Sequence, residues 1–159
     1  MDLPGSRHRR RRRALERALA TPSTRSLVAA AGLGASAGLR TGTPLAVLQL
    51  RGRLLPWPQG WWIMGGAAGE LIVDKLPVAG KRTSQVGLLG RMASAAWAGA
   101  VVAGPYGAGV AAATAVGSAF AGMQARALLI RRTGLPDGVF GTAEDLVAAA
   151  LATGATSLR

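Results

Sequence analysis

The chain contains no cysteine and a single histidine, and these scarcities remove much familiar catalytic and metal-binding chemistry. Without cysteine there is neither a disulfide framework nor a thiolate metal site. The one histidine, His8, lies inside an arginine run, so histidine-based catalysis is excluded elsewhere in the chain. There is also no Walker phosphate loop and no H-E-x-x-H motif. We therefore expect no enzymatic activity, no cofactor, no metal site and no catalytic residue.

Charged residues are scarce too, at 16% of the chain, and acidic residues number only seven against 19 lysines and arginines. Soluble domains average about 25% charged residues. Half of the residues are hydrophobic, and 23 are glycine. Glycine costs a soluble helix about 1 kcal/mol relative to alanine, whereas membrane helices use small residues to bring two backbones close together. The composition favours a membrane protein, and 159 residues suffice for one domain.

Residues 1–26 are predicted to form a basic, disordered cytoplasmic tail, with arginine at position 7 and at positions 9–13. One interpretation is an arm that binds RNA or the anionic head groups of lipids. The other is a retention signal that orients the first membrane helix. Nucleic acid is the less favoured partner, because no aromatic residue for base stacking is interleaved with the arginines.

Residues 27–159 are predicted to form an all-α membrane-embedded bundle of four transmembrane helices and a C-terminal fifth helix that spans the bilayer or lies in its interface. Lysine and arginine in the connections place the N-terminus inside, in a multi-pass protein of the cytoplasmic (inner) membrane. The loop with Arg51 and Arg53 is predicted outside, and Arg131 and Arg132 inside. The predicted spans are 27–50, 61–73, 86–103 and 108–130, with the fifth helix at 143–158.

The first of these spans is interrupted by Thr41, Thr43 and Pro44. Because Pro44 has no N–H, the carbonyl of Arg40 loses its helical partner, and either a threonine satisfies it or the helix breaks. Interrupted membrane helices are where transporters often place their binding sites. The alternative is a packing kink whose arginine is held by an acidic partner.

Four ionisable residues form a predicted intramembrane charge cluster: Arg40, Glu70, Asp74 and Arg91. Each charge near the bilayer centre costs about 2.5–3.5 kcal/mol on insertion scales and so needs a partner. Counting residues from the outer ends of two straight helices gives Arg40 and Glu70 similar depths, which predicts an ion pair between them. The same reasoning pairs Asp74 with Arg91, and Arg126 is predicted to snorkel to the interface.

Glycines recur at four-residue spacing in the first two predicted spans, at Gly34, Gly38 and Gly42 and again at Gly65 and Gly69. This G-x-x-x-G pattern predicts close packing of these two helices. The same faces suit a homo-oligomer.

Four motifs stand in order after Ser26: AGLRTGTPLA (37–46), GELIVDKLP (69–77), GLLGR (87–91) and GLPDGVFGTAEDLVAAALA (134–152). Together they resemble a bacterial family of small multi-pass membrane proteins, catalogued as domain of unknown function 4126. The resemblance implies an integral membrane protein and carries no assigned activity. The arginine-rich N-terminus departs from the family pattern.

Two functions remain open from the sequence. The first is a small transporter- or channel-like protein in which the four charged residues line a polar route through the bilayer. The second is a structural or accessory membrane protein, in which the same charges only fix helix packing.

Overall fold

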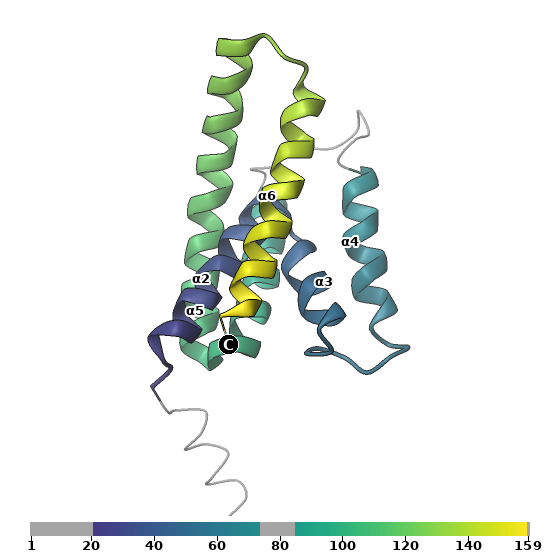
Figure 1. The fold of residues 1–159 in the computed structure, drawn as a ribbon, viewed down its shortest axis with the longest axis vertical. Coiled ribbons are helices and arrows are strands. Elements are labelled where there is room, and N and C mark those ends of the chain that lie inside the picture. The colour runs from purple at the N-terminus through teal and green to yellow at the C-terminus, as the bar shows by residue number, and fades with distance from the viewer. Residues whose placement is uncertain (1–20, 74–84, 159) are drawn as a thin grey trace, which may run out of the picture.

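A computed structural model describes residues 21–73 and 85–158, and for Leu71 and Val73 it describes the backbone alone. The described residues form helices without any strand, which confirms the all-α prediction (Figure 1). The five helices are α2 (Thr24–Leu39), α3 (Thr43–Leu50), α4 (Trp61–Val73), α5 (Gln85–Thr133) and α6 (Asp137–Ser157).

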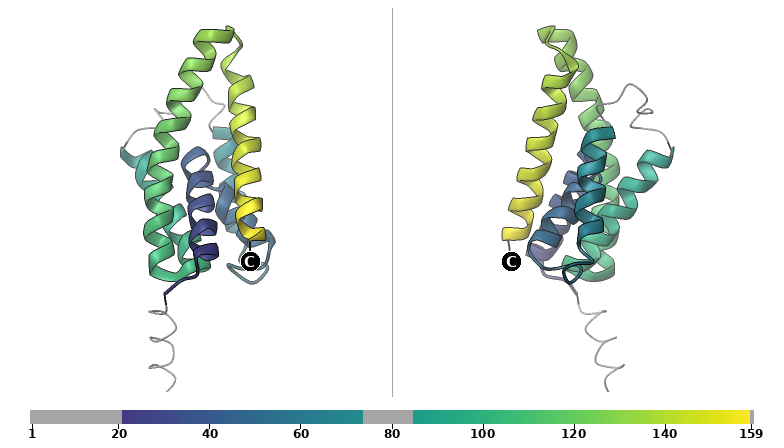
Figure 2. Two further views of the ribbon diagram at one scale, coloured as in Figure 1. Left: turned by 60° about the vertical axis from the view of Figure 1, so that its left-hand side comes forward. Right: turned by 90° about the vertical axis from the view of Figure 1, so that its right-hand side faces the viewer.

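Helix α5 is bent back on itself into two arms, 85–102 and 105–133 (Figure 2). Gly104 makes the bend with φ +62° and ψ −152°, a conformation that only glycine adopts readily. Where the arms meet, a Cβ atom on Gly99 would lie 2.2 Å from the carbonyl oxygen of Gly107, so both arms need glycine at this contact. The bend agrees with the turn predicted between the spans 86–103 and 108–130.

The segment 27–50 does not run straight. The ion pair between Arg40 and Asp145 shows that the end of α2 lies beside the first half of α6. The end of α3 lies beside the last turn of α6, where Arg51 Nη2 donates to Ser157 Oγ at 3.3 Å. Helix α3 therefore returns toward the end of the bundle at which α2 starts (Figures 1 and 2). The prediction that 27–50 runs in one direction as a single, interrupted span is wrong, because the chain reverses between the two helices.

Small residues fill the interior, and large apolar side chains cover much of the surface. Helix α2 packs against α5 and α6, with Leu33, Leu48 and Val102 the largest apolar side chains in a core made mostly of alanine. Outside, Trp62 is 85% exposed and Val86 is 81% exposed. The packing thus relies on close backbone approach and not on interlocking of large side chains.

Only α5 among the described helices is long and apolar enough to cross a membrane by itself. Helix α2 has 16 residues and α3 has 8. Helix α6 has 21 residues but includes Asp137, Glu144 and Asp145. Helix length and hydropathy therefore do not support the predicted four-span bundle.

Candidate functional site: the break between α2 and α3

The break consists of Arg40, Thr41 and Gly42. Arg40 is extended (φ −143°, ψ 114°), and its N–H donates to Ser36 O at 2.8 Å to close the last turn of α2. Helix α3 then begins at Thr43, with Pro44 in its first turn, where a missing N–H costs no helical hydrogen bond. The chain thus leaves the helix within the stretch in which the sequence predicts an interruption.

Glu70 of α4 binds the N-terminal end of α3. Its Oε1 accepts from Thr41 N–H at 2.8 Å, and its Oε2 accepts from Gly42 N–H at 2.5 Å. Backbone N–H groups at a helix start have no helical partner and carry partial positive charge, so a carboxylate is stabilised there. The approach is close, since a Cβ on Gly42 would lie 2.7 Å from Ala67 Cα.

Arg91 and Ser94 of α5 bind the other side of the break. Arg91 Nη1 donates to Gly38 O at 3.0 Å, in the last turn of α2, where carbonyl groups carry partial negative charge. Ser94 Oγ donates to Thr41 O at 2.5 Å. Arg91 is only 5% exposed. The C-terminal end of α2 therefore binds the cationic Arg91, and the N-terminal end of α3 binds the anionic Glu70. Each charge is opposite in sign to the partial charge of the helix end that it contacts.

Arg40 extends from the break toward α6. Arg40 is 3% exposed. Its side chain forms an ion pair with Asp145 and donates from Nη2 to Gly141 O at 3.4 Å. A buried guanidinium requires such partners, because leaving it uncompensated costs several kcal/mol. Asp145 thus joins the site from a position 105 residues further along the chain.

A second arginine joins α5 to the start of α6. Arg126 donates from Nε to Asp137 Oδ1 at 2.6 Å and from Nη1 to Glu144 Oε2 at 3.3 Å. Gly141 lies between the two arginines, since a Cβ placed there would be 3.7 Å from Arg126 Nη2 and 4.0 Å from Arg40 Nη2. The two arginines and three carboxylates form one continuous charged cluster along α6.

The structure gives two of the four predicted cluster residues other partners than expected. Glu70 and Arg40 both lie at the break, but Glu70 binds backbone amides while Arg40 binds Asp145. The predicted Arg40–Glu70 ion pair is wrong, because the depth estimate assumed that 27–50 was straight. Asp74 lies outside the described residues, so its pairing with Arg91 stays a prediction.

Sequence reasoning missed the contribution of α6. No cationic partner is predicted from the sequence for Glu144 or Asp145, and Arg126 is predicted only to snorkel. The available signal was that adjacent carboxylates inside an apolar helix need cationic partners. It does not identify which arginine provides the charge.

Ser36 stands in a G-x-S-x-G sequence, Gly34 to Gly38, which sequence reasoning also missed. A nucleophile elbow requires a sharp turn between a strand and a helix. Ser36 instead lies inside α2, fully buried, and donates to Ala148 O at 2.9 Å. Within the described residues there is likewise no group of three or more acidic, histidine or cysteine side chains placed to hold a metal ion.

The glycine pattern has a different role from the one predicted. Gly34 and Gly38 pack against α5, where added Cβ atoms would lie 2.2 Å from Ala111 O and 2.3 Å from Ala115 O. A Cβ added at Gly65 or Gly69 of α4 would meet no atom of another described segment within 4 Å. Close packing between the first two predicted spans is limited to Gly42 against α4.

Comparison with known proteins gives no further guide. No protein-family model, no curated protein and no solved structure matches this chain. Its function must therefore be argued from the charged cluster and from the surface around it.

Proposed function

We propose that the chain is a multi-pass protein of the cytoplasmic membrane, with the α2–α3 break as a polar site inside the bilayer. Two features support insertion. Large apolar side chains such as Trp62 and Val86 are exposed, while Arg40 and Arg91 are buried. Soluble proteins show the opposite preference, since arginine is almost never fully buried in them unless it is paired.

The proposed topology has four crossings and one re-entrant hairpin. The α5 arms 85–102 and 105–133 are about 27 Å and 44 Å long, and α6 is about 32 Å long, against a hydrocarbon core of about 30 Å. Helix α4 is the proposed fourth crossing. At about 20 Å it is shorter than the hydrocarbon core, and a locally thinned bilayer accommodates the difference. The α2–α3 pair enters and returns on the same side, and its non-helical turn is tolerated because side chains of α4, α5 and α6 satisfy its backbone.

Orientation follows from the basic residues at the end where α2 begins. The arginine-rich segment 7–13 precedes α2, and Arg51 and Arg53 follow α3 at the same end. The positive-inside rule places this end in the cytoplasm. This orientation reverses the sides predicted from the sequence for the Arg51–Arg53 loop and for Arg131 and Arg132, because α3 returns to the end at which α2 starts. Exposed Trp57 and Trp61 near this end suit a membrane–water interface.

The activity that best fits this geometry is that of a small transporter or channel that moves an ion or a small polar solute past the α2–α3 break. One observation carries this proposal: the C-terminal end of α2 and the N-terminal end of α3 meet among charged side chains. Discontinuous helices in transporters use this arrangement to bind charged solutes. Among the described helices α4 packs only against α3. We infer that Glu70 moves away from the amides of Thr41 and Gly42 together with α4, because the contacts of α2 with α5 and α6 do not involve α4.

Glu70→Gln tests this activity, because glutamine keeps the size of the side chain and removes its charge. Purified protein in liposomes, under a potassium chloride gradient, should raise proton, potassium or chloride flux above that of empty liposomes. Glu70→Gln should change this flux while the protein level stays normal. Arg132→Gln is the matched control, because Arg132 is exposed, and it should leave the flux unchanged. Wild-type flux equal to that of empty liposomes would contradict ion transport.

The second candidate is a structural or accessory membrane protein, whose charges only hold helices together. It is favoured by the hydrogen bonds at Thr41, Gly42 and Gly38, which bind α4 and α5 to the break. In this case Glu70→Gln should lower the amount of protein in the membrane and the Tm in detergent, with no flux to lose.

A further inference from the structure

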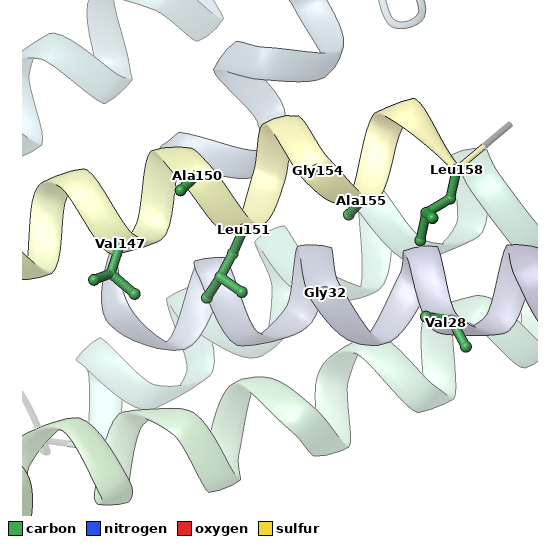
Figure 3. Close-up of a pocket in the computed structure, with 8 residues that line it drawn as sticks. All are labelled: Val28, Gly32, Val147, Ala150, Leu151, Gly154, Ala155 and Leu158. Carbon is green, nitrogen blue, oxygen red and sulfur yellow. The ribbon is translucent and has the colours of Figure 1, made fainter.

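An open apolar groove of about 430 Å³ lies between α2 and α6 (Figure 3). Every residue that lines it is aliphatic or glycine. Val28 and Gly32 come from α2, and the rest come from the second half of α6: Val147, Ala150, Leu151, Gly154, Ala155 and Leu158. At its base the helices are in close contact, since a Cβ on Gly32 would lie 2.9 Å from Ala155 Cβ.

The length of the groove matches one leaflet of a bilayer. Its lining on α6 runs from Val147 to Leu158, a rise of about 16 Å at 1.5 Å per residue. The hydrocarbon core of a bilayer is about 30 Å thick, so one leaflet provides about 15 Å. A groove that follows the helix axis over this distance suits an extended hydrocarbon chain.

The end of the groove at Val28 and Leu158 is positively charged. Arg25 is exposed and shares a helix face with Val28 and Gly32, at positions i, i+3 and i+7. Arg51 donates to Ser157 Oγ, next to Leu158. The acidic residues of α6 lie at its opposite end, and the nearest, Asp145, is 12 residues from Ser157, or about 18 Å. Among the described residues, cations at this end face no carboxylate.

We propose that this groove binds an anionic phospholipid, with an acyl chain along α2 and α6 and the phosphate held by Arg25 and Arg51. Arginine binds phosphate through several N–H donors at once, which makes it well suited to this contact. The inference rests on the proposed membrane insertion and is independent of transport. The bound lipid would belong to the cytoplasmic leaflet, because the proposed orientation places Arg25 and Arg51 there.

Native mass spectrometry of the full-length protein in detergent tests the site, with phosphatidylglycerol and phosphatidylcholine of identical acyl chains as probes. Wild-type protein should retain phosphatidylglycerol in preference to phosphatidylcholine. Arg25→Gln and Arg51→Gln should each weaken phosphatidylglycerol binding about fivefold. Phosphatidylcholine binding should weaken less, because its choline cation offsets the charge of its phosphate. Arg132→Gln, an exposed arginine in the last turn of α5, is the charge control and should have no effect.

Gly154→Leu tests the groove itself. Gly154 has no neighbour within 4 Å of an added Cβ, so leucine is accommodated and occupies the groove. It should reduce the binding of both lipids. Gly117→Leu, at an equally open glycine on α5, should not.

Equal retention of the two lipids by wild-type protein would overturn the proposal, and so would equal effects of Gly154→Leu and Gly117→Leu. A dimer that Gly154→Leu dissociates would assign the groove to a second copy of the chain and overturn it as well. Carbonate extraction distinguishes failure of the proposed membrane insertion from failure of the proposed lipid site. Release of the chain from membranes would reject insertion, whereas a retained chain without lipid preference would reject only the lipid site.

Discussion

Arg40 and Asp145 form an ion pair that joins the α2–α3 break to the last helix, across 105 positions of sequence. Arg40 is almost fully buried, whereas the side chain of Asp145 is 26% exposed. The pair therefore ties the turn between the two short helices to α6, at the level where Gly141 separates Arg40 from Arg126. We expect the folded bundle to depend on it.

Asp145→Asn should destabilise the protein by about 3 kcal/mol, because a buried guanidinium loses a charged partner. The measurement is the Tm in detergent. Asp137→Asn is the control, because the side chain of Asp137 is 67% exposed and exposed pairs contribute about 0–1 kcal/mol. Equal losses in the two variants would show that Arg40 does not depend on Asp145. The exchange Arg40→Asp with Asp145→Arg should recover part of the loss.

Gly42→Ala should separate α4 from the break. The added Cβ would lie 2.7 Å from Ala67 Cα, a backbone atom that cannot rotate away, and overpacking of this kind costs about 1–3 kcal/mol. Gly65→Ala on the same helix pair is the control, because Gly65 has no neighbour within 4 Å. The control should be neutral or stabilising by up to about 1 kcal/mol. Thermal unfolding of both variants checks the prediction, which fails if Gly42→Ala is the more stable.

Gly104→Ala should weaken the bend between the arms of α5. The backbone at Gly104 (φ +62°, ψ −152°) excludes a Cβ atom, and forcing one into this region costs about 1–3 kcal/mol. Gly109→Ala, five residues further on, has open space and ordinary helical backbone, so no loss is expected. If both variants unfold at the wild-type temperature, the bend at Gly104 is not required for the fold.

The sequence was sufficient to predict the all-α class and the bend of α5, since the Gly104–Pro105 pair separates two apolar stretches. It also located the interruption near Pro44. It could not reveal that the chain reverses there, because the length and hydropathy of 27–50 suit a straight span equally well. The reversal removes the basis for every bilayer depth predicted after Arg40.

The partners of the charged residues were harder to predict for the same reason. Glu70 was correctly expected near the break, but its ligands are the N–H groups of Thr41 and Gly42, and no side-chain pattern reports free backbone groups. Asp145 reaches Arg40 only because α6 packs antiparallel to α2. Pairings of this kind depend on the tertiary fold and not on local spacing.

In the proposed topology, α2 and α3 form a hairpin that returns to the side of the bilayer from which it started. Since the chain has no cysteine, single cysteines introduced at exposed Thr21, Gln59 and Leu135 can be labelled selectively. A membrane-impermeant maleimide should label positions 21 and 59 from the same side of the membrane, and position 135 from the opposite side. Labelling of position 59 from the same side as position 135, and not from the side of position 21, would contradict the proposed hairpin.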